Sequence, residues 1–134
     1  MIESADEFVR LRTSSESEQY RRAAHDEAPL EVWFDVIERF PEMRSWVAHN
    51  KTVPLVVLAL LVTDDDWRVR CAVADKRKLT PGLFWTLAAD RDEVVRASVA
   101  CNRKVPIDVL KSLAEDQTPL VRDAARDSLE RRSQ

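Results

Sequence analysis

Four arginines recur at a fixed spacing along this chain: Arg44, Arg70, Arg96 and Arg122 are each separated by 26 positions. A constant period of this length is the signature of repeat proteins, in which one short supersecondary unit recurs and each unit covers the apolar face of its neighbour. The period therefore restricts the possible folds more strongly than any single motif in the chain does.

Further columns of residues keep the register of the arginines. One apolar column follows each arginine by three positions, an acidic column precedes it by six, and two more apolar columns fall in the second half of each unit. These columns are Val47, Val73, Val99 and Ala125; Glu38, Asp64, Asp90 and Asp116; Leu58, Phe84 and Leu110; and Leu61, Leu87 and Leu113. So many coincident columns indicate a true repeat.

Each unit divides into two short helices, which we call helix A and helix B. In the unit best marked by local signals, helix A is expected over residues 67–75, after an acidic cluster that suits a helix N-terminus. Helix B is expected over residues 81–89, with Thr80 as its N-cap and a proline in its first turn. Because so short a pair is unstable alone, neighbouring pairs must stack. The sequence predicts an all-α superhelix, or solenoid.

The chain is expected to form one domain over residues 1–134, a length that can bury a sizeable core. A capping box from Ser4 to Glu7 opens a helix to about Arg12 within an irregular N-terminal cap, and a C-terminal helix closes the stack. A single glycine in the chain argues against a β-rich fold with many tight turns. The expected segments are a cap at 1–19, repeats at about 20–43, 44–69, 70–95 and 96–121, and a capping helix at 122–134.

One stretch of the repeat carries a family resemblance. Residues 95–116 follow the form V-R-x-x-V-A, then N-x-x-x-P, then V-L-x-x-L-A-x-D. This form is similar to leucine-rich repeat variant units and to HEAT repeats, and the similarity extends over residues 20–126. The resemblance implies a right-handed superhelix of helix pairs. It also implies a binding surface rather than one particular activity, because a shared fold does not define function.

Neither the composition nor the motifs of the chain indicate catalysis or a cofactor. The net charge of −3 argues against a general nucleic-acid binder. The two cysteines lie 30 positions apart without a CxxC, which argues against a zinc site. There is no glycine-rich phosphate loop, no GxSxG and no HExxH. We therefore expect no enzyme activity, no cofactor and no metal.

Targeting signals are also missing from the sequence. It has no signal peptide, no lipidation motif and no apolar run near 18 residues, since the apolar stretch 53–62 is short and contains Pro54. We expect a soluble, cytoplasmic protein that makes no contact with membranes.

Two sets of residues are candidates for contacting a partner. Trp46 and Trp67 depart from the repeat, since their columns otherwise hold small, acidic or proline residues, and tryptophan is common in interaction hot spots. The loops between helix A and helix B are basic, whereas the loops from helix B to the next helix A are acidic. The basic residues, predicted to form one edge of the stack, are Lys51, Lys76, Arg77, Lys78, Arg103 and Lys104.

Two further columns have the residue types of a functional site but suit a structural role. In the Asp/Arg columns, we expect each Asp to cap helix A and each Arg to bridge to the neighbouring unit. The other column, five positions after each arginine, could in principle bind metal. Packed helices lie about 8–10 Å apart, too far for members of such a column to share one ion. That column is His25, His49, Asp75, Cys101 and Asp127.

These observations favour a non-catalytic scaffold that presents a curved helical-repeat surface to a protein. The alternative is nucleic-acid binding through phosphates at the basic edge, for which DNA glycosylases with a HEAT-like fold give a precedent. A weaker alternative is an inhibitor or immunity-type protein that neutralises a basic partner through its acidic edge. An enzyme built on the column of His25, His49, Asp75 and Cys101 is the remaining alternative.

Overall fold

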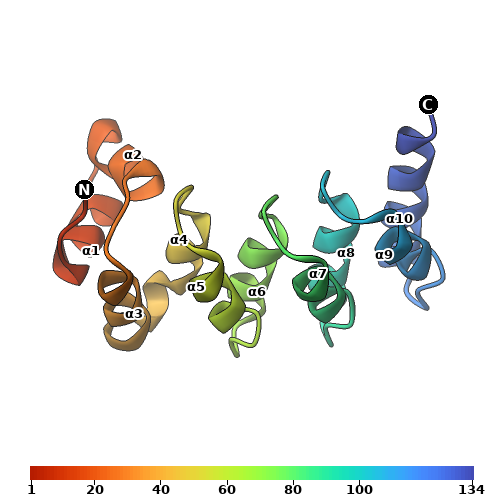
Figure 1. Ribbon diagram of the computed structural model, residues 1–134, viewed down its shortest axis with the longest axis horizontal. Helices are drawn as coiled ribbons and strands as arrows, with labels where there is room; N and C mark the ends of the chain where they lie inside the picture. Colours follow the sequence, from red (N-terminus) through yellow and green to blue (C-terminus); the bar gives the residue numbers. More distant parts are fainter. The chain divides into compact units, whose positions relative to one another are not determined.

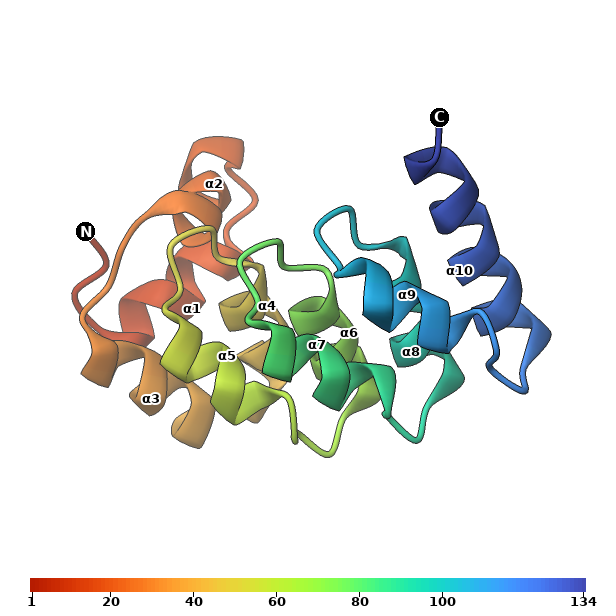
Figure 2. The ribbon, with the colours of Figure 1, turned by 45° about the vertical axis from the view of Figure 1, so that its right-hand side comes forward.

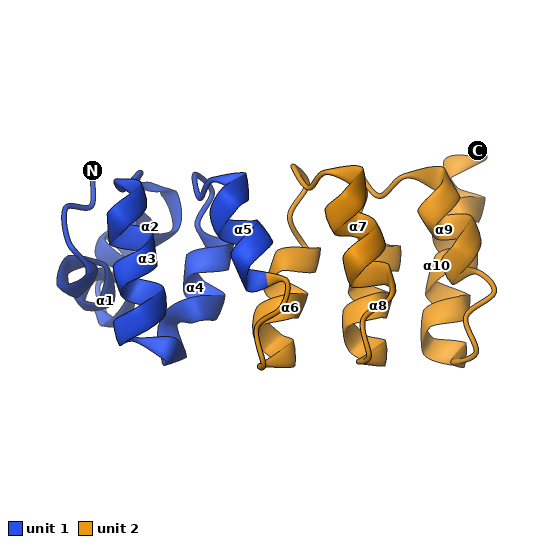
Figure 3. Ribbon diagram, turned by 60° about the horizontal axis from the view of Figure 1, so that its bottom comes forward, with its two compact units in different colours: residues 1–61 blue, residues 62–134 orange.

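The computed structural model describes all of residues 1–134 and contains ten α-helices, one short 3-10 helix and no β-strand (Figure 1). The prediction of an all-α fold is therefore confirmed. The chain divides into two compact units, residues 1–61 and residues 62–134, which Figure 3 distinguishes by colour. Each unit is described by itself below.

Unit 1 contains five α-helices and the 3-10 helix. Its first helix begins as the capping box predicts, because the Ser4 Oγ accepts the Glu7 backbone N–H at 3.0 Å. The Glu7 carboxylate in turn accepts the backbone N–H of Glu3 at 2.9 Å. The elements are α1 (Ala5–Thr13), α2 (Ser17–His25), α3 (Leu30–Arg39), η1 (Pro41–Met43), α4 (Arg44–His49) and α5 (Leu55–Leu61).

The core of unit 1 forms where α1 packs against both α2 and α3. The rings of Phe8 on α1 and Trp33 on α3 meet edge to face, with centroids 5.3 Å apart and planes at 81°. Both side chains are fully buried. Because α1 covers α3, Trp33 is a core residue of this unit, whereas Trp85 of the same repeat column is exposed on its helix.

Unit 2 alternates the two predicted helix types. The A-type helices α6, α8 and α10 pack on one another in order, and the B-type helices α7 and α9 form a second row beside them (Figure 2). As predicted, α7 begins at Pro81, with the Thr80 Oγ1 accepting the Leu83 backbone N–H at 3.2 Å. The elements are α6 (Trp67–Ala74), α7 (Pro81–Ala88), α8 (Glu93–Cys101), α9 (Ile107–Leu113) and α10 (Pro119–Arg132).

The apolar columns of the repeat fill the interiors of the two units. All members of the three columns are buried, at 3% exposure or less. The buried positions are Val47, Val73, Val99, Ala125, Leu58, Phe84, Leu110, Leu61, Leu87 and Leu113. The 26-residue period therefore marks the residues that pack inside.

Arginines of unit 2 bridge between consecutive helix pairs. Arg96 donates from Nε to Asp116 Oδ2 at 2.9 Å and from Nη2 to Asp116 Oδ1 at 3.3 Å. Arg70 makes the same two-fold contact with Asp90. Each guanidinium also donates to a main-chain carbonyl of the loop before its own helix, as Arg70 Nη1 does to the Asp64 oxygen at 2.6 Å. The predicted arginine bridge is thus confirmed for these two residues.

The expectation that the column aspartates cap helix A is wrong. The side chains that cap α6 and α8 belong to Asp66 and Asp92, two positions later in the chain. The column residues Asp64 and Asp90 instead accept the backbone N–H of these capping residues, at 3.0 and 2.9 Å. An aspartate bonded to the N–H two residues ahead forms an Asx turn, which bends the chain into the helix start. The column residue therefore shapes the loop and leaves the cap to another side chain.

Buried asparagines join two of the loops after helix A, the α4–α5 loop and the α8–α9 loop, to the preceding helix pair. In unit 1, Asn50 Nδ2 donates to the carbonyls of Ala23 and Asp26, at 2.8 and 3.0 Å. In unit 2, Asn102 Nδ2 donates to Ala74 at 2.8 Å and to Lys76 at 2.7 Å. These bonds satisfy carbonyls at helix ends that have no partner within their own helix.

None of the helices combines the length and the apolar character that crossing a bilayer requires.

Candidate functional site

The basic loops of unit 2 are brought together by hydrogen bonds between main chain and side chains. The α6–α7 loop carries Lys76, Arg77 and Lys78, and the bond from Asn102 to the Lys76 carbonyl ties it to the α8–α9 loop, which carries Arg103 and Lys104. Figure 3 shows both loops at the same end of the unit's helices. The structure therefore joins five of the six predicted basic residues into one edge.

Arg131 and Arg132, at the end of α10, extend this basic edge and escaped the sequence analysis. Arg132 Nη2 donates to the carbonyls of Asn102 and Arg103, at 3.2 and 2.7 Å. Arg131 is instead held by Asp127 at 2.7 Å, which partly offsets its charge. Arg131 and Arg132 lie at this edge because α10 packs along α8. The last turn of a helix commonly carries basic residues, so the sequence alone gave no reason to single these two out.

Lys78 and Lys51 differ from the other predicted basic residues. Burial lowers the pKa of Lys78 below the ordinary value for lysine, because a desolvated ammonium is disfavoured. Lys51 belongs to unit 1, where its backbone N–H donates to the Ala24 carbonyl at 2.7 Å. It is exposed in the α4–α5 loop and is described separately from the edge of unit 2.

Trp46 lies on α4 in a stack of aromatic and basic side chains. The guanidinium carbon of Arg12 lies 3.4 Å from the centroid of its indole, and the His49 ring lies 5.3 Å away. The same guanidinium is 5.9 Å from the ring centroid of Tyr20 on α2. Trp46 remains 37% exposed. It therefore both joins α4 to the end of α1 and offers an aromatic surface, and neither Arg12 nor Tyr20 was identified from the sequence.

Trp67 is the first residue of α6 in unit 2, and 43% of it is exposed. It follows Asp66, whose carboxylate accepts the Arg68 backbone N–H at 2.9 Å and pairs with the Arg68 guanidinium at 3.1 Å. These hydrogen bonds from Arg68 hold the pKa of Asp66 below its ordinary value. Trp46 and Trp67 belong to different units and are treated as two separate features.

The column of His25, His49, Asp75, Cys101 and Asp127 is exposed throughout. Its first four members lie at or next to the C-terminal ends of α2, α4, α6 and α8, whereas Asp127 lies within α10. The structure contains no group of three or more histidine, cysteine or acidic side chains that could hold a metal ion. The other cysteine, Cys71, is half-buried beside Ser98, and its pKa is raised mainly by burial. A raised pKa keeps this thiol protonated and poorly nucleophilic.

An apolar surface of unit 1 was missed by the sequence analysis. It consists of Leu30 and Phe34 on α3 and Val56 and Leu60 on α5, which are 40%, 38%, 54% and 50% exposed. The two helices lie side by side in Figures 2 and 3. Each pair is spaced by four residues and so projects from one side of its helix. We call these four residues the apolar face.

The repeat itself shows that these positions need not be apolar. Positions 30 and 56 correspond to Gly82 and Asp108, and positions 34 and 60 correspond to Thr86 and Ser112, all of which are exposed. The fold therefore accepts small or polar residues at the same places of α7 and α9. The signal in the sequence is α5 itself, Leu-Val-Val-Leu-Ala-Leu-Leu, in which only one side of a wholly apolar helix is buried.

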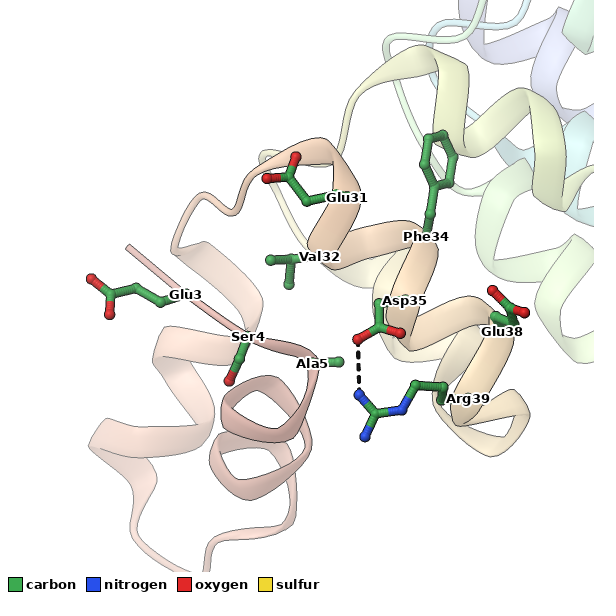
Figure 4. A pocket seen from close by; sticks show the side chains of 9 residues that line it. All are labelled: Glu3, Ser4, Ala5, Glu31, Val32, Phe34, Asp35, Glu38 and Arg39. Carbon is green, nitrogen blue, oxygen red and sulfur yellow. Dashed lines mark hydrogen bonds and ion pairs between the residues drawn. The ribbon is translucent and has the colours of Figure 1, made fainter.

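An acidic hollow adjoins the apolar face. It has a volume of about 520 Å³ and lies between the start of α1 and the outer side of α3 (Figure 4). Its single cation, Arg39, is bound by Asp35 at 2.8 Å and by Asp6 at 3.1 Å. Phe34 belongs both to this lining and to the apolar face. The other lining residues are Glu3, Ser4, Ala5, Glu31, Val32 and Glu38.

No family model, no curated protein and no solved structure matches the chain. The fold and these surfaces define an all-α protein of short packed helices that exposes an apolar face, an acidic hollow and a basic edge.

Proposed function

We propose that the chain is a non-catalytic scaffold that binds a protein partner, and that it is a solenoid of four short two-helix repeats of the leucine-rich repeat variant or HEAT-like kind. The apolar face on α3 and α5 is the observation that carries the proposal of protein binding. Contiguous exposed apolar side chains are uncommon on soluble proteins and mark sites of contact with other molecules.

The apolar face departs from the repeat where no packing requirement explains the departure. Phe34 and Leu60 are exposed at positions where α7 and α9 have Thr86 and Ser112. An aromatic ring among aliphatic side chains is the usual centre of a protein interface, since its burial gains much free energy for little loss of conformational freedom. Selection for binding accounts for these residues better than selection for folding does.

The solenoid part of the proposal is supported by the regularity within unit 2. The bridges from Arg70 to Asp90 and from Arg96 to Asp116 join residues 20 positions apart in both cases and have the same two-fold geometry. Such a bond repeated at one period is what successive stacked pairs produce. The burial of the apolar columns in both units agrees with it.

Comparative capture tests the binding function. The full chain is immobilised as wild type, as the double variant Phe34→Ser/Leu60→Ser, and as the control Thr86→Ala/Ser112→Ala, which alters the equivalent exposed positions of α7 and α9. Proteins retained from the source cells are quantified by mass spectrometry. We expect at least one protein that wild type and control retain and that the first variant loses. Equal retention by all three chains would contradict the proposal.

Phosphate binding by the basic edge of unit 2 is a second candidate, favoured by the hydrogen bonds that join the α6–α7 and α8–α9 loops. A gel shift with duplex and single-stranded nucleic acid at low salt tests it, because phosphate contacts weaken steeply as salt rises. The variant Lys76→Glu/Arg77→Glu/Lys78→Glu should then lose the shift, whereas Arg91→Glu/Lys111→Glu should keep it. No shift by the wild type removes this candidate.

We further propose that the scaffold acts in the cytoplasm, where thiols remain reduced. Both cysteines are free, and neither has a disulfide partner within the chain.

A further inference from the structure

We propose that the segment that docks on the apolar face is a basic amphipathic helix of the partner protein. This inference rests on the proposed function and adds the chemistry of the partner. It follows from the geometry of the apolar face and from the charges beside it.

The shape of the apolar face suits a helix. Leu30 and Phe34 form one row on α3, and Val56 and Leu60 form a second row on the adjacent α5. A helix that lies along two neighbouring helices places its own side chains between such rows, with apolar residues three and four positions apart. Binding of a peptide as an added β-strand would need an exposed strand edge, and the structure contains no strand.

The negative charge beside the apolar face favours a basic partner. Four carboxylates line the hollow against one guanidinium, and Arg39 is already bound by Asp35 and Asp6. The exposed carboxylates of Glu31 and Glu38 take part in no ion pair, and α5 carries no charged residue. A docked segment therefore meets an excess of negative charge on the α3 side and none on the α5 side.

A basic amphipathic helix matches both features at once. Its apolar residues cover the four side chains of the apolar face, while lysine or arginine stems pass over Phe34 and place their charged ends in the hollow. Long basic side chains commonly bury their stems on apolar surface and keep the charged end in a polar setting. An acidic helix would add like charge next to Glu31 and Glu38, and opposite charge at this rim also speeds association.

Selection from a random peptide library tests the inference. Displayed peptides of about 16 residues, long enough for four helical turns, are selected on the immobilised full chain after depletion on Phe34→Ser/Leu60→Ser. We expect the enriched peptides to carry an excess of lysine and arginine, with apolar residues at helical spacing. Synthetic copies are then titrated by fluorescence anisotropy against wild type, that variant, Glu31→Lys/Glu38→Lys and Thr86→Ala/Ser112→Ala.

The expected result has three parts. Phe34→Ser/Leu60→Ser weakens binding at least about tenfold, as is usual when central apolar anchors are lost. Glu31→Lys/Glu38→Lys weakens it about tenfold at low salt and less at high salt, because exposed charges are screened. Thr86→Ala/Ser112→Ala leaves the dissociation constant unchanged.

Other outcomes overturn the inference in distinguishable ways. Enriched peptides that are acidic or neutral, or that bind Glu31→Lys/Glu38→Lys as well as wild type, refute the basic partner and leave protein binding intact. If every peptide binds wild type and Phe34→Ser/Leu60→Ser with the same dissociation constant, helix docking on this face is refuted. The capture experiment then decides separately whether a folded partner binds there. If sedimentation shows that wild type forms a dimer and that Phe34→Ser/Leu60→Ser is monomeric, the apolar face is occupied by a second copy of this chain and not by another protein.

Discussion

Arg70 and Asp90 form a two-fold ion pair between consecutive helix pairs of unit 2, with Nε–Oδ2 at 2.7 Å and Nη2–Oδ1 at 3.2 Å. Their side chains are only 3% and 8% exposed. The hydrogen bond to Asp90 raises the pKa of Arg70 above the ordinary value for arginine. The pair is thus buried, charged and fully hydrogen-bonded, and its loss of hydration is offset only while both partners remain.

Removing one member of this pair should strongly destabilise the protein. Asp90→Ala leaves a buried guanidinium without its carboxylate, and we expect the free energy of unfolding to fall by about 3–5 kcal/mol. The matched control is Arg68→Ala, which removes the exposed pair with Asp66 and should cost less than about 1 kcal/mol. Urea unfolding followed by circular dichroism measures both. A loss as small for Asp90→Ala as for Arg68→Ala would show that the bridge does not hold the pairs together.

Asp116 should make stability depend on pH in the acid range. Burial alone would raise its pKa, but the hydrogen bonds from Arg96 and Thr118 outweigh burial and hold the pKa below the ordinary value. A carboxyl with a lowered pKa in the folded state stabilises the fold above the unfolded pKa of about 3.9, and this contribution is lost as the pH falls through the folded pKa. The difference in unfolding free energy between wild type and Asp116→Asn should therefore be full at about pH 6 and shrink below about pH 4. A difference that stays constant over this range would contradict the prediction.

Asn102 should anchor the α6–α7 loop, which carries Lys76, Arg77 and Lys78 of the basic edge. Asn102→Ala removes the donor to the Ala74 and Lys76 carbonyls, and leaving such buried groups unpaired should cost about 1–3 kcal/mol of unfolding free energy. Hydrogen exchange at the end of α6 should accelerate in the variant. Lys104→Ala, an exposed change two residues later, is the control and should change neither quantity. Unchanged exchange in Asn102→Ala would rule out the anchoring role.

Arg12 and Trp46 should be energetically coupled across unit 1. A guanidinium 3.4 Å from the ring centroid is close enough for a cation–π interaction, worth about 0.5–1 kcal/mol at exposed sites. The double-mutant cycle of Arg12→Ala and Trp46→Ala should give a coupling of that size in unfolding free energy. Arg10→Ala with Trp46→Ala serves as the control cycle, since Arg10 pairs with Glu7, and it should give no coupling. Equal values in the two cycles would contradict the stacking.

The sequence predicted well the features that rest on local signals or on the period. The start of α7 follows from Thr80 and Pro81, which set the cap and the first turn whatever lies around them. The bridges of Arg70 and Arg96 follow from two charged columns at one period, because equivalent positions in stacked units make equivalent contacts. The expected C-terminal helix is also present, although α10 covers Pro119–Arg132 and so begins three residues before the expected segment at 122–134.

The features that were predicted wrongly or missed from the sequence have physical explanations. Three consecutive aspartates, Asp64 to Asp66, precede α6, and the sequence does not say which one caps the helix and which one forms the turn before it. The stack of Arg12 on Trp46 joins residues far apart in the chain without a repeating pattern, so no column indicated it.

The apolar face was missed for another reason. Tryptophans depart visibly from the repeat, because they are rare and bulky. Phe34 and Leu60 have ordinary core residue types and stand out only at the outward positions of the four B-type helices, where α7 and α9 have polar equivalents.

The most direct test of the account concerns whether the fold itself needs the apolar face. The measurement is the unfolding free energy of Phe34→Ser/Leu60→Ser relative to wild type, from urea titration of the full chain. Because the fold covers part of both side chains, the double substitution should cost only about 1–2 kcal/mol if these residues serve a partner, well below the loss from two core positions. A joint loss of several kcal/mol, as expected for core positions, would show that these residues hold the fold together and would contradict the account.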